Sequence, residues 1–371
     1  MALHFFQQAR LVLAVFLLAA ASGCTQLTRL PGERPNQGQR PGGGHGPGGK
    51  GHGGSTADKP GGGSSAEAAA SYVNELTLPT SASPLQASNK FAANVHYGTS
   101  DRLVFDMYLP QGPAPAPLLI FIHGGGFANG DKGSFHKRFV PEITAWLNAG
   151  FGVATINYRF LDEGPDGVMN SLKDIRRCLQ FIRYHAQELG IDKDRIGCMG
   201  ISAGAGASIW LATHDDMADP NSSDPIARES TRIRAVAAYD PQSSYDIFSW
   251  DPLCMEAYGV RPTDDPKFQP RVTAFYGTTS FQALKTDPAI LAMRKDLDMP
   301  SKMDRSDPEM WLASNQTDLK PSNVLHNPVH IKRLAETAQS KGIKVNAQVP
   351  LLPLSMGSTE SLRDFFLRTL K

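Results

Sequence analysis

The chain has 371 residues, of which 41% are hydrophobic and 20% charged, and its formal net charge is +1. This length and apolar content are sufficient for one large α/β domain with a sizeable core. Basic and acidic residues balance and no basic patch stands out, so we expect no nucleic-acid partner.

The first 24 residues have the features of a secretion signal. Arg10 supplies a positive charge, and the apolar run 11–21 is too short to span a bilayer. The run ends in Ala21-Ser22-Gly23-Cys24, which resembles a bacterial lipobox, where the cysteine becomes the lipidated first residue of the mature protein. We expect Cys24 to anchor the protein to the membrane of a bacterial cell envelope, on its periplasmic or outer-membrane face. The alternative is an N-terminal anchor helix with an incidental cysteine.

Residues 25–70 are rich in glycine and proline and cannot bury apolar surface, which predicts a disordered linker. His45 and His52 in this linker are expected to be solvated rather than to bind a metal. Three further cysteines, Cys178, Cys198 and Cys254, lack the short spacings of a zinc site or a disulfide framework. We therefore expect no metal and no organic cofactor.

Residues 71–371 alternate between strand and helix patterns. The predicted strands are 94–97 and 103–109, which form a hairpin, then 118–122, 152–156, 196–199, 235–239, 310–313 and 344–349. The predicted helices are 139–149, 171–189, 205–214, one starting near Pro328, and 362–370. Such alternation implies a mostly parallel central sheet with helices on both faces. The segment from about 246 to 307 is rich in proline and aspartate, and we interpret it as a small cap insertion or, alternatively, a poorly packed surface insertion.

Two glycine motifs follow two of these strands. Residues 123–127 read His-Gly-Gly-Gly-Phe, and residues 200–204 read Gly-Ile-Ser-Ala-Gly. The second motif predicts a nucleophile elbow, whose small residues two positions before and after the serine prevent a clash between strand and helix. The first predicts a loop whose backbone N–H groups stabilise an oxyanion. The candidate nucleophile is Ser202, and the candidate oxyanion donors are Gly124, Gly125, Gly126 and Ala203.

At these residues the chain resembles the α/β-hydrolases of the esterase/lipase type, in particular the feruloyl-esterase-like and hormone-sensitive-lipase-like carboxylesterases. The resemblance rests on 123–127, on Asn157-Tyr158-Arg159 and on 174–208, and it covers about 92–371, fading between about 247 and 308. The segment 214–246 also resembles a subset of bacterial envelope esterase-like proteins. The resemblance implies an α/β-hydrolase fold with a serine, a histidine and an acid at its site.

The histidine is missing from its expected place. The resemblance puts it after the last strand, but 344–357 contains none, and Met356 stands there instead. It also puts the acid after the strand 310–313, where Asp318 is the candidate. His326 is the better replacement for the base because it lies in a loop at the same sheet edge, whereas His330 falls in the first turn of a helix. His123 is expected to brace the oxyanion loop.

Two functions remain open. The first is a carboxylic-ester hydrolase in which Ser202 attacks the ester, His326 transfers the proton and Asp318 orients the imidazole. The resemblance implies a small-molecule or polysaccharide-linked ester as its substrate. The second is a binding protein that keeps the hydrolase fold without turnover, because a serine with no base is a neutral alcohol. The intact elbow favours the enzyme, since strained turns are costly to keep for structure alone.

Overall fold

The computed structural model describes residues 72–85, 89–320, 323–352, 354 and 359–371. Cys24, the linker 25–70 with its two histidines, and Met356 lie outside these residues, so their predicted roles remain predictions. Within the described part of the chain, no helix is both long and apolar enough to cross a membrane.

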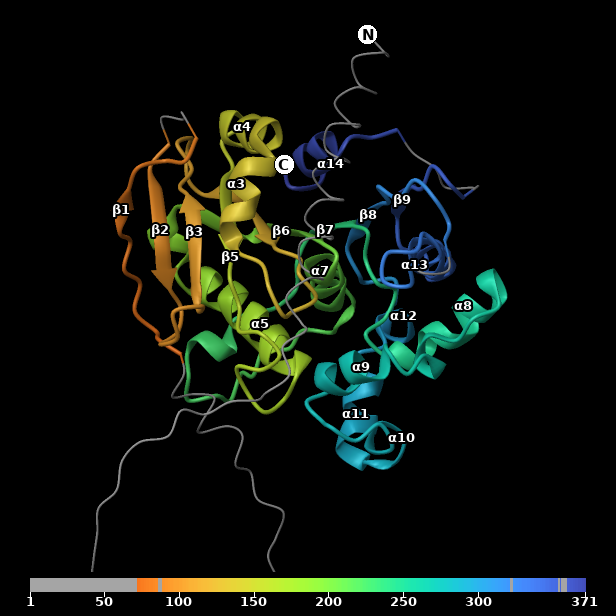
Figure 1. Cartoon of the computed structure of the whole chain (residues 1–371). Coiled ribbons are helices and arrows are strands. Elements are labelled where there is room, and N and C mark those ends of the chain that lie inside the picture. The colour runs from red at the N-terminus through yellow and green to blue at the C-terminus, as the bar shows by residue number, and fades with distance from the viewer. Residues whose placement is uncertain (1–71, 86–88, 321–322, 353, 355–358) are drawn as a thin grey trace, which may run out of the picture. The chain divides into compact units, whose positions relative to one another are not determined.

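One nine-stranded sheet organises the described residues, in the order β1-β2-β3-β5-β4-β6-β7-β8-β9 (Figure 1). β1, β2 and β3 pair antiparallel, as does β3 with β5, and the remaining pairs are parallel. The strands are β1 (Thr80–Ser81), β2 (Phe91–His96), β3 (Val104–Tyr108), β4 (Ala116–Ile122), β5 (Gly152–Ile156), β6 (Ile191–Ile201), β7 (Ala235–Tyr239), β8 (Glu309–Ala313) and β9 (Val345–Gln348). The predicted mostly parallel sheet and the opening hairpin are confirmed.

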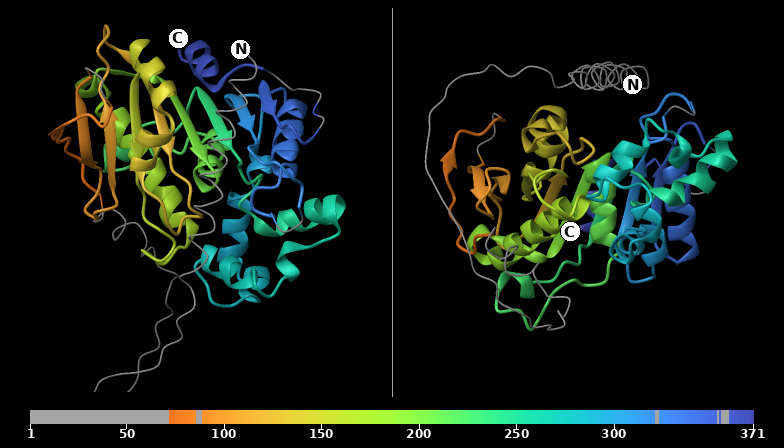
Figure 2. Two further views of the ribbon diagram at one scale, coloured as in Figure 1. Left: turned by 45° about the horizontal axis from the view of Figure 1, so that its top comes forward. Right: turned by 60° about the horizontal axis from the view of Figure 1, so that its bottom comes forward.

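Helices cover both faces of this sheet, as predicted (Figure 2). All five predicted helices are present with shifted ends, and the one predicted over 171–189 is split in two. They are α4 (Val140–Asn148), α5 (Val168–Tyr184) with α6 (Ala186–Leu189), α7 (Ala203–Thr213), α13 (Val329–Ser340) and α14 (Leu362–Thr369). A short helix that the sequence pattern does not predict, α3 (Phe135–Arg138), precedes α4. α14 packs against α4, where the Trp146 and Phe366 rings meet edge to face.

Between β7 and β8 the chain forms a helical insertion that falls within the predicted cap segment. It contains α8 (Trp250–Tyr258), α9 (Gln269–Phe275), α10 (Ala283–Thr286), α11 (Pro288–Asp296) and α12 (Met299–Lys302). The insertion is well packed: α12 contacts α7 and α13, and α8 contacts α13. It is therefore not the poorly packed surface segment that was the alternative.

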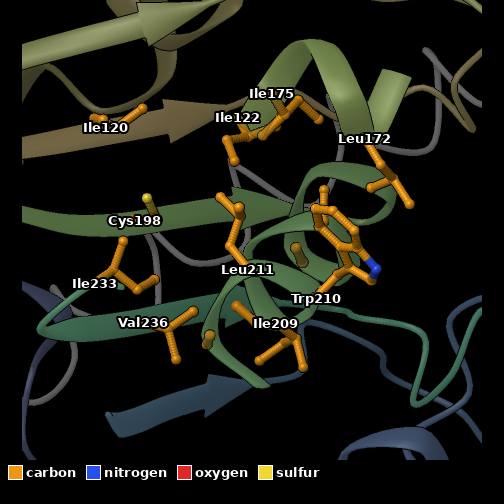
Figure 3. Packing of buried hydrophobic residues seen from close by; sticks show 14 of the residues in the cluster. Ile120, Ile122, Leu172, Ile175, Cys198, Ile209, Trp210, Leu211, Ile233 and Val236 are labelled. Carbon is orange, nitrogen blue, oxygen red and sulfur yellow. The ribbon is translucent and has the colours of Figure 1, made fainter. Parts of the chain in front are cut away.

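The main core lies between the sheet and the helices α5 and α7. Figure 3 shows Ile175 of α5 beside Ile122 of β4, and Ile209 of α7 beside Val236 of β7. All of these side chains are buried, which removes a large apolar area from water and stabilises the layered arrangement. The three described cysteines are also buried and unpaired, so they act as small core residues.

Candidate active site

Ser202 lies on a sharp turn between β6 and α7. Its φ is 53° and its ψ is −119°, a backbone conformation that non-glycine residues rarely adopt. Its neighbours in the motif cannot carry side chains: a Cβ on Gly200 would lie 2.2 Å from the carbonyl carbon of Gly204. A Cβ on Gly204 would lie 2.0 Å from the Ile122 carbonyl oxygen on β4. The turn therefore has the geometry of a nucleophile elbow.

His326 reaches the serine from the loop between β8 and α13. Its Nε2 lies 2.8 Å from the Ser202 Oγ, a hydrogen-bonding distance. Burial lowers the pKa of His326 below its ordinary value of 6.5, although the charge of Asp240 opposes this effect. The imidazole is therefore neutral at pH 7 and can accept a proton from the serine hydroxyl.

Neighbouring elements hold the loop that carries His326. Gln242, just after β7, donates from its Nε2 to the Leu325 carbonyl at 2.7 Å. Tyr258 of α8 donates its hydroxyl to the Asn327 Oδ1 at 2.5 Å. These two bonds flank His326 on either side, so its backbone is fixed by both the sheet edge and the insertion.

His330 does not approach the serine. It is fully buried, its Nε2 lies 2.8 Å from the Val324 carbonyl oxygen, and its Nδ1 lies 3.0 Å from the Ser243 hydroxyl. Burial lowers its pKa to about 4, so it is a neutral core residue at pH 7. Its role is to help shape the loop before α13.

Asp318 is not brought to His326. Its carboxylate pairs with Lys320 at 2.8 Å, and its side chain is 46% exposed. No hydrogen bond or ion pair joins it to His326 among the described contacts. The physical reason is local: Asp318 lies in a polar loop and binds the backbone N–H and the ammonium of its near neighbour Lys320. This corrects the expectation that Asp318 orients the imidazole.

Asp240 is the acid beside His326. It directly follows β7, is 7% exposed, and has a positive φ of 47°. Its Oδ1 accepts hydrogen bonds from the Ser314 hydroxyl at 3.0 Å and the Asn315 N–H at 3.1 Å. Burial raises the pKa of this carboxyl, and the charge of His326 lowers it. Sequence reasoning missed Asp240, although it stands immediately after a strand that pairs with the serine's own strand.

The oxyanion loop lies against the nucleophile. A Cβ on Gly124 would lie 3.3 Å from the Ser202 Cβ, and Gly125 and Gly126 have positive φ values of 120° and 64°. Ala203 is the first residue of α7, so its N–H has no acceptor within the helix and is available to an anion. The four predicted donors thus belong to two segments that meet at Ser202.

The Asn157-Tyr158-Arg159 segment supports this loop. Asn157 accepts from the Lys132 N–H at 2.7 Å and donates to Asp131 at 2.8 Å. The Tyr158 hydroxyl donates to the His123 carbonyl at 2.7 Å. Arg159 pairs with the buried Asp174, with its Nη2 2.7 Å from the carboxylate. His123 braces the loop, as expected, because its Nδ1 lies 2.7 Å from the Gly124 oxygen.

Within the described ranges, no three or more histidine, cysteine, aspartate or glutamate side chains gather to hold a metal ion. What the site does bring together is a serine hydroxyl, a neutral imidazole, a buried carboxylate and a set of backbone N–H groups. This set of groups can perform nucleophilic attack on a carbonyl without an added cofactor.

Known proteins resemble this chain in sequence. A probable isoprenylcysteine alpha-carbonyl methylesterase of Arabidopsis thaliana is 30% identical over 145 residues, which cover 38% of this chain and 29% of that protein. Chlorogenic acid esterase of Aspergillus niger is 28% identical over 169 residues, which cover 40% of this chain and 32% of that protein. The chain thus matches less than a third of the length of either relative.

Solved structures share the fold. A truncated carbohydrate esterase from gut microbiota superposes with a TM-score of 0.58 at 17% identity, covering 79% of this chain and 99% of that one. At this identity the likeness concerns the fold alone. The sheet order, the elbow and this superposition establish an α/β-hydrolase fold. The model of the BD-FAE family matches residues 105–287, which contain the glycine loop, Ser202 and Asp240. This segment of the chain is therefore similar to the BD-FAE family.

Proposed function

We propose that the protein is a carboxylic-ester hydrolase that uses Ser202 as its nucleophile and His326 as its general base. The observation that carries this proposal is the 2.8 Å contact between the Ser202 Oγ and the His326 Nε2. The sequence relatives support it, because both relatives described above are named as esterases. The absence of a histidine after the last strand no longer favours a binding protein, since an imidazole from another loop contacts the serine.

The reaction follows from this geometry. The Ser202 oxygen attacks the ester carbonyl carbon while His326 takes the hydroxyl proton at its Nε2. The carbonyl oxygen becomes an oxyanion, which backbone N–H groups of Gly124, Gly125, Gly126 and Ala203 stabilise. His326 then returns the proton to the leaving alcohol, which leaves an acyl group on the serine. Water, deprotonated by the same imidazole, releases the acid and restores the hydroxyl.

Asp240 supplies the third group in this proposal. Because Nε2 of His326 faces the serine, the other ring nitrogen, Nδ1, is the one that a carboxylate would hold. Asp240 is buried and interacts electrostatically with His326. Its negative charge would stabilise the imidazolium that forms when the serine loses its proton.

The proposed substrates are small-molecule or polysaccharide-linked esters. A chlorogenic acid esterase among the relatives and a carbohydrate esterase among the structures of like fold support this class. We also propose that the enzyme works at the bacterial cell envelope, anchored by a lipid on Cys24. The support for this location is the Ala21-Ser22-Gly23-Cys24 ending of the apolar N-terminal run.

The direct test of the proposed function is hydrolysis of a short-chain aryl ester by the purified protein. Ser202→Ala and His326→Ala should each lower kcat/KM by a similar factor of at least about a thousand, because members of such a unit act together. His96→Gln is the control, since His96 is an exposed histidine on β2. If the wild-type protein binds esters but hydrolyses them only at a background rate, and none of these variants changes that rate, the protein is a non-catalytic binding protein.

A further inference from the structure

Arg102 reaches the oxyanion loop from the turn between β2 and β3. Its Nε donates to the Tyr158 carbonyl at 2.9 Å, and its Nη2 donates to the Gly130 carbonyl at 3.3 Å. The same Nη2 lies 3.4 Å from the His123 Nε2. The guanidinium carbon also lies 3.7 Å from the centre of the Phe160 ring. One side chain therefore connects both ends of the loop 123–130 to the segment after β5.

This contact and the Gly124 carbonyl together decide where His123 carries its proton. A guanidinium group has donors only, so the His123 Nε2 beside it must be the acceptor. The ring proton of the neutral imidazole then resides on Nδ1, which lies 2.7 Å from the Gly124 carbonyl oxygen and donates to it. Burial lowers the pKa of His123 to about 4, and the charge of Arg102 acts in the same direction. The ring is therefore neutral at pH 7.

The Gly124 carbonyl in turn decides the direction of an N–H group. The Gly124 C=O and the Gly125 N–H belong to one planar trans peptide unit and point in opposite directions. Fixing the oxygen against His123 therefore fixes the direction of the Gly125 N–H. By the same geometry, the hydrogen bond from the Tyr158 hydroxyl to the His123 carbonyl fixes the direction of the Gly124 N–H.

These peptide units need such restraint because the loop is made of glycines. Gly125 and Gly126 have positive φ values, and glycine populates several backbone regions with little energetic difference. Without a partner for its carbonyl, the unit between Gly124 and Gly125 could rotate away from the serine. A preorganised donor is what stabilises a developing charge.

We propose that Arg102 is a positioning residue for the oxyanion hole. It holds His123 in the Nδ1–H form, and His123 then aims the Gly125 N–H at the oxyanion that forms above Ser202. The effect on turnover rests on the proposed hydrolase function, whereas the effect on the His123 proton does not.

The expected kinetic signature separates kcat from KM. An oxyanion hydrogen bond is made in the transition state and not with the ground-state ester, so its misalignment lowers kcat and leaves KM nearly unchanged. Losing one oxyanion donor costs about a hundredfold to a thousandfold in kcat. Misdirecting one donor without removing it should cost roughly tenfold to a hundredfold.

The test compares Arg102→Met, Arg102→Lys and Glu163→Gln in the full-length protein. Methionine keeps an unbranched side chain against Phe160 but has no hydrogen-bond donor. Lysine keeps a charged ammonium donor but lacks the planar guanidinium, which can donate to several acceptors at once. Glu163→Gln is the matched control, because Glu163 lies 3.7 Å from the Arg102 Nε and is 37% exposed. A glutamine oxygen can still accept the hydrogen bond that the Phe160 N–H donates to Glu163. Nitrogen-15 NMR of labelled histidines reports the proton position, with the His123 signals assigned from a His123→Gln variant.

The wild-type protein and Glu163→Gln should show His123 with its proton on Nδ1 and equal kcat values. Arg102→Met should shift the proton toward Nε2 and lower kcat roughly tenfold to a hundredfold at unchanged KM, with Arg102→Lys between. A wild-type His123 with its proton on Nε2, or an Arg102→Met variant with unchanged tautomer and kcat, would overturn the inference. If Arg102→Met does not fold, the wild-type spectrum and Arg102→Lys carry the test. A tautomer shift in a protein without esterase activity would instead count against the proposed function alone.

Discussion

Among the described residues, three of the four non-glycine residues with a positive φ lie at the candidate site, and the fourth is Asn94 on β2. Ser202, Asp240 and Phe127 have positive φ values of 53°, 47° and 58°. Each follows a strand or the glycine loop at the edge of the sheet where Ser202 lies. Such strain persists only where the surrounding structure enforces it, and it gathers at functional sites. The strained positions thus point independently to the same set of residues as the hydrogen bonds do.

At the residue scale, the variants Asp240→Asn and Asp318→Asn test which of the two aspartates orients the imidazole of His326. Asparagine keeps an oxygen that can accept from Ser314 and Asn315, so the fold should persist while the charge beside His326 is lost. We expect kcat/KM on an aryl ester to fall roughly a hundredfold or more, because the imidazolium loses its stabilising partner. Asp318→Asn should change it less than about twofold, since Asp318 is exposed and pairs with Lys320. The reverse order of effects would show that Asp318 orients the imidazole after all.

At the scale of elements, the site uses earlier strands than the family resemblance predicts. The resemblance places the acid after β8 and the histidine after β9, whereas Asp240 follows β7 and His326 follows β8. This arrangement works because β6, β7 and β8 are adjacent and parallel, so their carboxyl ends meet at one edge. The Asp240 N–H even continues the ladder by donating to the carbonyl of Ala313, the last residue of β8, at 2.8 Å.

The sequence was sufficient for the parts of the site that depend on local structure. The elbow at 200–204 and the glycine loop at 123–127 are contiguous motifs, whose backbone geometry follows from the small residues within them. Asp240 could not be chosen in this way, because an aspartate in a loop has the same local features as Asp318. What separates the two is burial, which depends on how the loop after β8 folds over the sheet edge.

The helices of the insertion escaped prediction for a related reason. α9, α10 and α12 have seven residues or fewer, too short for a helical period to stand out from the sequence. Their stability comes from tertiary packing, as in the contact of α12 with α7 and α13. The segment could therefore be recognised as an insertion but not resolved into elements.

At the scale of the whole molecule, the N-terminal region sets where the enzyme would act. Replacing Cys24 with serine removes the thiol that a lipid would modify, so the Cys24→Ser protein should be released from membranes or left unprocessed. Fractionation of cells into membrane and soluble parts measures this, and Cys254→Ser is the control because Cys254 is a buried core residue. A Cys24→Ser protein that stays with the membrane as the wild type does would rule out lipid anchoring at this residue.

The proposed mechanism requires His326 to act as a neutral base toward Ser202, and the decisive measurement is the pH dependence of kcat/KM. Protonated His326 cannot accept the serine proton, so kcat/KM should fall as the pH falls through the pKa of His326 in the free enzyme. Because burial lowers that pKa, the half-maximal point should lie below pH 6.5 on a short-chain aryl ester. In the His326→Ala variant, kcat/KM should be at least about a thousandfold lower, and its fall at acidic pH should disappear. An unchanged kcat/KM with an unchanged fall at acidic pH in His326→Ala would show that His326 is not the base.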